Sequence, residues 1–263
     1  MLEQIVKEGV DVAGDQYPYS ASSTSMTGAL FPRWALSGGR EATLKYMADE
    51  DDRGRIIDSI NEIFNQGRGA DGTIIARYVS DKSLEGKNLD EIAKFMETTS
   101  AEAILRIYEK SEAYVVFKSM DENDVDEFAK HNFISVSSDG RSLSNEGILS
   151  SGKPHPRSYG SNPRFIQKFV NEKKLVSIQE AVRKMTSMPA QRLGLTNRGR
   201  LTPGYAADIV IMDLLNVKEN ATFDNPHQYP SGVSHVIVNG EIVIRDEKFT
   251  GKTPGKMITN FNS

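Results

Sequence analysis

Short apolar runs alternate with amphipathic segments along the chain, which is the pattern of a mixed α/β protein. The first residues predict a helix that Gly9 ends, then a short strand over 10–13 and a polar loop from Asp15. Two later apolar runs, 113–118 and 133–138, are each typical of a strand that is buried on both faces. We therefore expect parallel strands that alternate with helices, as in an α/β barrel or a doubly wound sheet.

Residues 22–112 interrupt this alternation. They contain a strand-like run at 73–79 and several amphipathic segments with helical spacing, of which the clearest are 56–64, 89–96 and 104–108. Asn88 is the expected N-cap of the second of these, with Glu91 at its third helical position. A segment of this length with helical faces of its own predicts an inserted, mainly helical unit. The alternation of strand and helix is expected to resume at residue 113.

Further helix signals follow within 113–194. Pro163 is expected to open one helix, because proline suits the first helical position. Ser177 begins a capping-box sequence that predicts the start of the next helix, on which Val182 and Met185 face the core. This stretch therefore predicts the last strands and helices of a barrel.

The pattern after Gly194 is that of β structure alone. A strand is expected over 208–213, and Asn239-Gly240 between two apolar runs predicts a hairpin with a type I′ turn. The chain is thus expected to have four parts, which are a barrel strand with a motif loop (1–21), an inserted lid (22–112), the last barrel strands and helices (113–194) and a small β-domain (195–263).

Composition removes several classes of function. The formal net charge of −4 is not that of a dedicated nucleic-acid binder, and no apolar run is long enough to span a membrane. The chain has no cysteine, which excludes disulfides and thiolate zinc sites, and its four histidines form no H-x-H motif. This histidine pattern predicts that the chain has no self-contained histidine-rich metal site. No signal peptide is evident at the start, so we expect a cytoplasmic protein.

Asp139 is the first candidate for chemistry. It directly follows the apolar run 133–138, and catalytic groups of α/β barrels lie at the C-terminal ends of the strands. A carboxylate at this position can ligate a metal and can accept a proton from bound water. The alternative is that Ser138-Asp139-Gly140 forms only a turn.

Arg157 is the second candidate. It lies in His155-Pro156-Arg157, after a long polar loop, and its planar guanidinium suits a substrate carboxylate. The alternative is an ordinary surface arginine. Tyr17 and Ser23 follow the first predicted strand, where their hydroxyl groups can line the mouth of a pocket. The alternative for the tyrosine is that its aromatic ring packs beneath a loop.

The chain carries a series of ordered motifs, which include Asp15-Gln16-Tyr17-Pro18-Tyr19, Ser138-Asp139-Gly140, His155-Pro156-Arg157, Arg198-Gly199-Arg200-Leu201 and Asp224-Asn225-Pro226-His227-Gln228-Tyr229-Pro230. In this order they resemble the C-terminal part of the N-acyl-D-amino-acid deacylases (D-aminoacylases) of the metal-dependent amidohydrolase superfamily. The resemblance runs over nearly the whole chain. The Arg-Gly-Arg-Leu motif alone marks only the wider superfamily.

The resemblance implies an α/β fold: a partial (β/α)8 barrel with an inserted lid at 22–112 and a small C-terminal β-domain. It implies hydrolysis of the N-acyl amide of a D-amino acid by zinc-activated water. Asp139 matches the aspartate that contacts the metal and acts as base and then acid. Arg157 matches the arginine that binds the substrate carboxylate, and Tyr17 and Ser23 match a tyrosine and a serine that contact substrate.

Part of the family pattern is missing. The H-x-H motif and the other metal ligands of the family are expected before Asp15, and fourteen residues cannot hold them. We therefore expect a C-terminal portion that begins inside the barrel, with most zinc ligands upstream and a missing N-terminal half as a partner. The alternative is a truncated, non-catalytic half-barrel that acts as a binding or assembly module.

Overall fold

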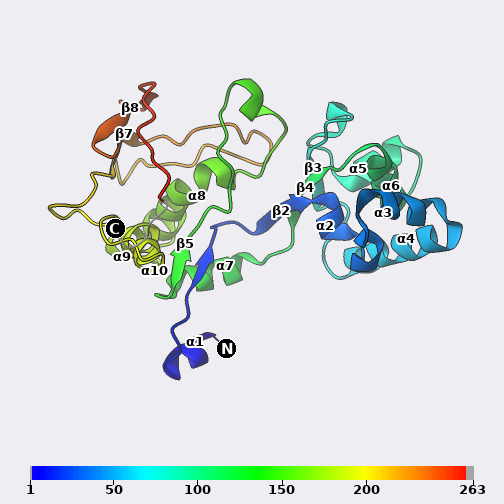
Figure 1. Ribbon diagram of the computed structural model, residues 1–263, viewed down its shortest axis with the longest axis horizontal. Helices are drawn as coiled ribbons and strands as arrows, with labels where there is room; N and C mark the ends of the chain where they lie inside the picture. The colour runs from blue at the N-terminus through cyan, green and yellow to red at the C-terminus, as the bar shows by residue number, and fades with distance from the viewer. Residues whose placement is uncertain (1, 259–263) are drawn as a thin grey trace.

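The computed structural model describes residues 2–258, which contain three separate β-sheets (Figure 1). A stretch that includes strands β2 and β4 connects a helical body at one end of the molecule to the rest of the chain. No helix within the described part of the chain is both long and apolar enough to cross a membrane. Each sheet belongs to one unit, and we call these the central unit (2–20 and 119–194), the helical unit (21–118) and the β unit (195–258).

The central unit is built on two short parallel strands, β1 (Gly14–Gln16) and β5 (Ile134–Val136). Its helices are α1 (Leu2–Lys7), α7 (Glu122–Lys130), α8 (Arg157–Phe165), η4 (Ile166–Glu172), α9 (Ile178–Met185) and α10 (Ser187–Arg192). Val136, Phe165 and Phe169 belong to one buried apolar cluster that joins β5 to α8 and η4. This arrangement confirms the mixed α/β class, and membership of an eight-stranded barrel stays a prediction.

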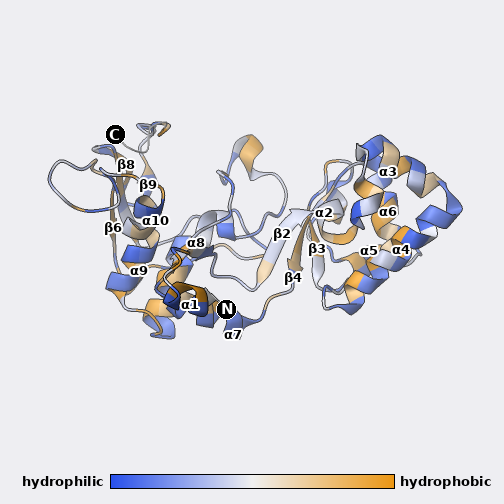
Figure 2. Ribbon diagram, turned by 60° about the horizontal axis from the view of Figure 1, so that its bottom comes forward, coloured by the Kyte–Doolittle hydropathy of each residue, from blue (hydrophilic) through white to orange (hydrophobic). Residues whose placement is uncertain are grey.

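The helical unit contains a three-stranded antiparallel sheet in the order β2-β4-β3. The strands are β2 (Ala21–Ser25), β3 (Thr73–Arg77) and β4 (Tyr114–Lys118), and the helices are α2 (Met26–Leu30), η1 (Arg33–Leu36), α3 (Gly39–Ala48), α4 (Glu50–Asn65), η2 (Lys82–Leu84), α5 (Leu89–Phe95) and α6 (Ser100–Lys110). Asn88 and Glu91 form the predicted capping box at the start of α5. Buried apolar residues of α4, α5 and α6 belong to one extensive core, and Figure 2 shows hydrophobic positions along these three helices.

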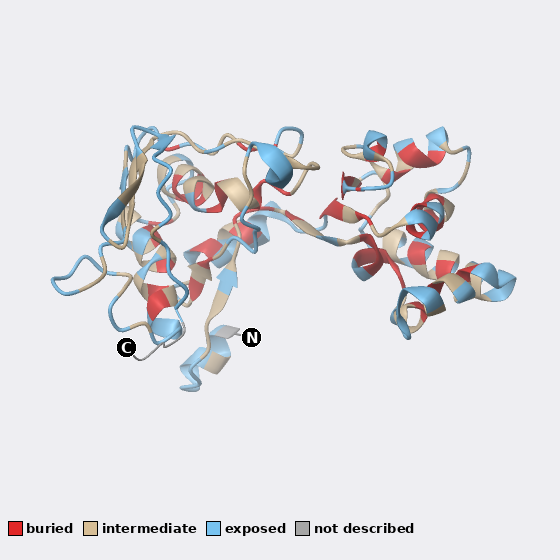
Figure 3. Cartoon of the chain, turned by 45° about the horizontal axis from the view of Figure 1, so that its top comes forward, coloured by how far each residue is buried: buried red, intermediate tan, exposed pale blue. Residues whose placement is uncertain are grey.

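The β unit is a four-stranded antiparallel sheet with strands β6 (Ile209–Met212), β7 (Val233–Val238), β8 (Glu241–Arg245) and β9 (Lys248–Phe249). Asn239 and Gly240 have φ angles of 48° and 81°, which agrees with the predicted type I′ turn. No strand residue of this sheet is fully buried, and Figure 3 shows the sheet as intermediate or exposed throughout. The predicted β-domain extends to residue 263, and 259–263, like Met1, lie outside the described residues.

The first strand lies later than predicted. The sequence indicated residues 10–13, whereas β1 spans Gly14–Gln16 and pairs with Ile134–Val136. A Cβ atom on Gly14 would lie 2.8 Å from the Ile134 side chain, so the close approach of the two strands requires glycine at this position. The register of this pair, rather than the apolar character of 10–13, therefore sets where the strand begins.

The strand over 113–118 exists, but the prediction that it resumes the barrel is wrong. It is β4, the middle strand of the antiparallel sheet of the helical unit. Val115 and Phe117 face the large core, while Val116 packs with Ala21 and Ala76 on the other face. A central strand that is covered on both faces has the same apolar sequence in either kind of sheet, so its pattern could not distinguish them.

Two helix predictions are also wrong in part. Pro163 does not open a helix, because α8 already begins at Arg157 and continues past the proline into the π-helical segment η4. Val182 is 43% exposed, whereas Ala181 and Lys184 on the same helix are fully buried. The aliphatic stem of a lysine can lie inside if its ammonium group finds acceptors, which periodicity alone does not reveal.

Candidate functional site

A pocket of about 380 Å³ lies where the helical unit meets the central unit. β2 and β3 form one wall, and the long polar loop 139–156, which includes η3 (Gly147–Ser150), forms another. Asp139, Arg157 and Ser23 all line this pocket. The loop that the sequence singled out by its length thus contributes directly to the cavity.

Asp139 and Arg157 form an ion pair across the pocket wall. The Arg157 Nη2 atom lies 2.8 Å from Asp139 Oδ2, and the side chains are 9% and 67% exposed respectively. Arg157 also donates to the Ser23 carbonyl oxygen at 3.3 Å, and its guanidinium lies 4.7 Å from the centre of the Tyr17 ring. The four residues selected from the sequence are therefore neighbours in space, although more than 130 positions separate Ser23 from Arg157.

The backbone brings these side chains together through one close contact. A Cβ atom on Gly140 would lie 2.9 Å from the Ser158 Cα atom, and the Arg141 amide donates to Ser158 Oγ at 3.1 Å. The end of β5 is thereby fixed against the start of α8. The turn interpretation of Ser138-Asp139-Gly140 is partly right, because Ser138 Oγ accepts from the Gly140 amide at 3.1 Å, but the Asp139 carboxylate points to Arg157.

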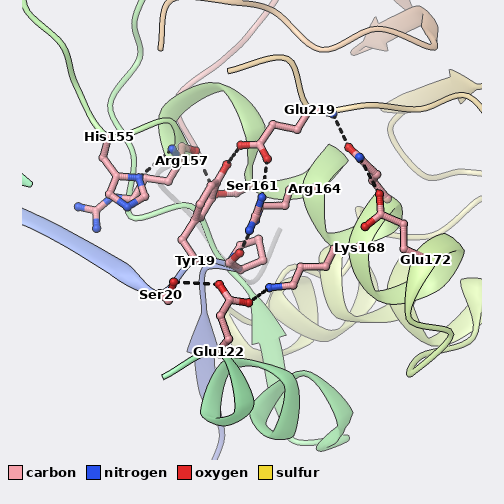
Figure 4. A network of polar contacts seen from close by, with 12 residues as sticks. Tyr19, Ser20, Glu122, His155, Arg157, Ser161, Arg164, Lys168, Glu172 and Glu219 are labelled. Atoms are coloured by element: carbon pink, nitrogen blue, oxygen red, sulfur yellow. Dashed lines mark hydrogen bonds and ion pairs between the residues drawn. The ribbon is translucent and has the colours of Figure 1, made fainter. Parts of the chain in front are cut away.

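His155 lies next to Arg157 and contacts its backbone (Figure 4). Its Nε2 atom lies 2.9 Å from the Ala21 carbonyl oxygen, and its Nδ1 atom accepts from the Arg157 amide at 3.0 Å. Burial, together with the nearby charges of Arg157 and Arg164, lowers the pKa of His155 to about 3. The imidazole is therefore neutral and holds the backbone at Arg157, and neither ring nitrogen is free to bind a metal.

The Amidohydrolase family matches residues 147–244 of this chain. Three curated relatives from Alcaligenes xylosoxydans xylosoxydans are similar over most of it. An N-acyl-D-glutamate deacylase is 34% identical over 88% of the chain, a D-aminoacylase is 32% identical over 71%, and an N-acyl-D-aspartate deacylase is 31% identical over 74%. The chain spans only 36–38% of the length of these relatives.

Solved structures agree with this result. A crystal structure of D-aminoacylase aligns with 95% of the chain at a TM-score of 0.70 and 28% identity, although the chain covers only 43% of that protein. The chain matches the C-terminal part of the N-acyl-D-amino-acid deacylases of the amidohydrolase family. The N-acyl-D-glutamate deacylase of Bordetella bronchiseptica, whose structure contains zinc and a phosphonate inhibitor, aligns with 92% of the chain at a TM-score of 0.69 and 28% identity, and the chain covers 41% of it.

Zinc is present in the structure of the Bordetella bronchiseptica deacylase. The described residues contain no group of three or more histidine, cysteine, aspartate or glutamate side chains that could hold a metal ion. Asp139 is a single carboxylate and is already paired with Arg157. A stable zinc site needs at least three protein ligands, so residues 2–258 do not form one by themselves.

Tyr19, Arg164 and Glu219 form a buried polar cluster that the sequence did not predict. The Glu219 side chain is 7% exposed, accepts from the Tyr19 hydroxyl, and pairs with Arg164 at 2.9 Å (Figure 4). Burial and the adjacent Glu219 charge raise the pKa of Tyr19, so the phenol stays protonated. A Cβ atom on Gly160 would lie 2.5 Å from Glu219 Oε1, which explains the glycine after Tyr159. Tyr19 belongs to the motif Asp15-Gln16-Tyr17-Pro18-Tyr19, whereas Glu219 lies in a segment without a recognised motif.

Proposed function

We propose that this chain forms the substrate-carboxylate and proton-transfer side of an N-acyl-D-amino-acid deacylase. The observation that carries the proposal is the pair of Arg157 and Asp139 at the wall of the pocket. A buried guanidinium can bind the substrate carboxylate, and an exposed carboxylate in the same cavity can transfer protons. The relatives named for this chemistry support the same reaction.

Arg157 is suited to bind the substrate α-carboxylate. Its guanidinium is largely removed from water and is held by the Ser23 carbonyl and the Tyr17 ring, so little conformational freedom is lost on binding. The ion pair with Asp139, in which a carboxylate oxygen lies 2.8 Å from Arg157 Nη2, supports this assignment. Tyr17 contacts the guanidinium through its ring, while its hydroxyl group is hydrogen-bonded to Ser22 Oγ at 2.9 Å.

Asp139 is suited to carry the proton. Hydrolysis adds a water oxygen to the acyl carbon and breaks the C–N bond, so one proton must leave the water and one must reach the departing nitrogen. An exposed carboxylate that faces the pocket can perform both transfers in turn. Residues 2–258 supply too few ligands for zinc, so we assign no step to a metal held by this chain alone.

The remaining parts of the proposal concern assembly. The relatives are longer than this chain, and we propose that an N-terminal portion, in the same or a separate polypeptide, supplies the other metal ligands and the remaining barrel strands. We further propose that the helical unit acts as a lid, because β2 and β3 line the pocket from one side while the loop 139–156 lines it from the other. Deacylase activity is then a property of the joined portions.

Two measurements test the proposal. The chain alone should bind N-acetyl-D-methionine in isothermal titration more tightly than the L-enantiomer, and Arg157→Gln should abolish this binding. Coexpression with the N-terminal portion of the N-acyl-D-glutamate deacylase relative, in the presence of zinc, should give D-specific hydrolysis that Asp139→Asn removes. If the chain bound neither enantiomer and the coexpressed portions formed a complex without turnover, the proposal would be wrong.

A second function is favoured by one observation, which is the absence of a metal-binding group within the described residues. A half-barrel that binds an N-acyl amino acid without hydrolysing it would serve as a binding or assembly module. This function predicts normal binding and no turnover, even when the zinc content of the coexpressed complex is stoichiometric. The same pair of measurements therefore separates the two functions.

A further inference from the structure

We propose that His227 is a positioning residue for the pocket, which connects the β unit to the loop 139–156 and holds this loop in the place where it encloses the substrate. This inference rests on the proposed function. It assigns a role to the motif Asp224-Asn225-Pro226-His227-Gln228-Tyr229-Pro230, which the proposed reaction does not use. The motif lies between β6 and β7, in a segment that reaches from the β unit toward the loop (Figure 1).

One peptide group of the loop is held from two sides. Its carbonyl oxygen, which belongs to Gly152, lies 3.0 Å from His227 Nε2 in the β unit. Its N–H group, which belongs to Lys153, donates to the Ala76 carbonyl oxygen on β3 at 2.6 Å. A Cβ atom on Gly152 would lie 2.7 Å from the same Ala76 oxygen, so the loop lies directly against β3. This single peptide group therefore joins the helical unit to the β unit.

The second ring nitrogen of His227 contacts α8. Its Nδ1 atom lies 2.8 Å from the Tyr159 hydroxyl oxygen. A carbonyl oxygen only accepts, so Nε2 carries the ring hydrogen, and in the neutral ring Nδ1 then accepts from this hydroxyl. Burial and the adjacent Tyr229 raise the pKa of Tyr159, so the hydroxyl keeps its proton. Both nitrogens are thus used, and one of them contacts the helix that begins at Arg157.

The motif fixes His227 through bonds within its own segment. The Gln228 side-chain amide donates to the carbonyl oxygens of Asn220 and Asn225, at 2.7 Å and 3.0 Å. The Asn220 side-chain amide donates to the Tyr229 carbonyl oxygen at 2.9 Å. These partners all lie within 220–229, so the segment has a shape of its own and presents His227 as a fixed donor to the loop.

The loop depends on such contacts because it packs little of its own surface. Ser151 and Pro154, on either side of the held peptide group, line the pocket, whereas the Ile148 side chain is 91% exposed. Without the bond from His227, the loop spends more time away from the pocket wall. Affinity for the substrate then falls with the fraction of molecules in which the wall is in place.

The test separates the two hydrogen bonds of His227 with two variants of the whole chain. The longer side chain in His227→Gln can still donate to the Gly152 oxygen, whereas the amide in His227→Asn lies near the position of Nδ1 and does not reach it. Hydrogen exchange of residues 147–153 is measured by mass spectrometry, and affinity for N-acetyl-D-methionine by isothermal titration. We expect His227→Asn to exchange about threefold to tenfold faster and to bind more weakly by a similar factor, and His227→Gln to stay within about twofold of the wild type.

His235→Asn is the matched control. His235 is also a histidine of the β unit, but it lies in β7, where Ile211 and Arg245 are its register partners. It should leave exchange and affinity unchanged, and unchanged exchange in α6 shows that each variant is folded. Wild-type exchange or wild-type affinity in His227→Asn, or an equal loss in His227→Gln or the control, would overturn this inference and leave the proposed function intact. If the wild-type chain bound no N-acetyl-D-amino acid, the proposed function would fail and this inference with it.

Discussion

Lowering the pH should destabilise this protein through His155. Each ring nitrogen of His155 faces a backbone group: Nε2 donates to the Ala21 carbonyl oxygen, and Nδ1 accepts from the Arg157 amide. A second proton on the ring would place an N–H group on Nδ1 directly against the N–H group of Arg157. Burial and the charges of Arg157 and Arg164 add to this conflict, and the pKa of His155 lies at about 3.

The size of the effect follows from the difference between the folded and unfolded states. An unfolded histidine has a pKa near 6.5, so between pH 6.5 and about 3 the unfolded chain binds one more proton at this residue than the folded chain. The free energy of unfolding therefore falls as the pH decreases through this window, by at most about 1.4 kcal/mol per pH unit. At pH 5 the loss is about 2 kcal/mol, a substantial part of a typical stability of roughly 5–15 kcal/mol.

The assay compares the wild-type protein with His155→Gln, since glutamine can still donate to Ala21 but does not titrate. Urea unfolding at pH 7.5, 6 and 5 should show a steeper loss of stability in the wild type than in this variant. His131→Gln, which removes a histidine 24% exposed at the surface, serves as the control. Nitrogen-detected NMR of the imidazole should show the neutral Nε2–H form down to pH 5. A His155 ring that titrates near pH 6.5, or equal pH slopes in wild type and His155→Gln, would refute this reasoning.

Three further outcomes are expected. Burial lowers the pKa of Lys184 from 10.5 to about 8, so between these pH values the unfolded chain binds more protons than the folded chain and the free energy of unfolding should rise with pH. Urea unfolding at pH 7.5 and 10 should show that Lys184→Met removes part of this rise. An equal rise in the wild type and the variant would contradict the prediction. Gly160→Ala should cost about 1–3 kcal/mol in thermal unfolding, since its Cβ atom would meet the Glu219 carboxylate, and an unchanged Tm would show that this cluster can move. In the assembled enzyme, Asp139→Asn should lower kcat about 10²–10⁴-fold with little change in KM, whereas Arg157→Lys should mainly raise KM. Both are measured by steady-state kinetics, with the zinc content of each variant determined alongside. The opposite pattern in the two variants would disprove these roles.

Local signals in the sequence were sufficient for the elements whose geometry depends on nearby residues. The capping box of Asn88 and Glu91, the cap at Ser177 and the Asn239-Gly240 turn all form as expected, because their partners lie within a few positions along the chain. The motif resemblance also identified Asp139 and Arg157, and the structure places Asp139 Oδ2 at 2.8 Å from Arg157 Nη2. Neither composition nor periodicity could show that these two side chains meet.

The tertiary structure decided everything that depends on which distant segments pair. The run 113–118 has the apolar pattern of any strand covered on both faces, and only its pairing with β2 and β3 places it in the antiparallel sheet. Lys184 is buried because the carbonyl oxygens of His131 and Ile134 lie within reach of its ammonium group, and no spacing rule encodes that. Glu219 and Arg164 meet across 55 positions in the same way. A polar side chain can be buried wherever the fold supplies its partners, and those partners are set by three-dimensional packing rather than by the neighbouring sequence.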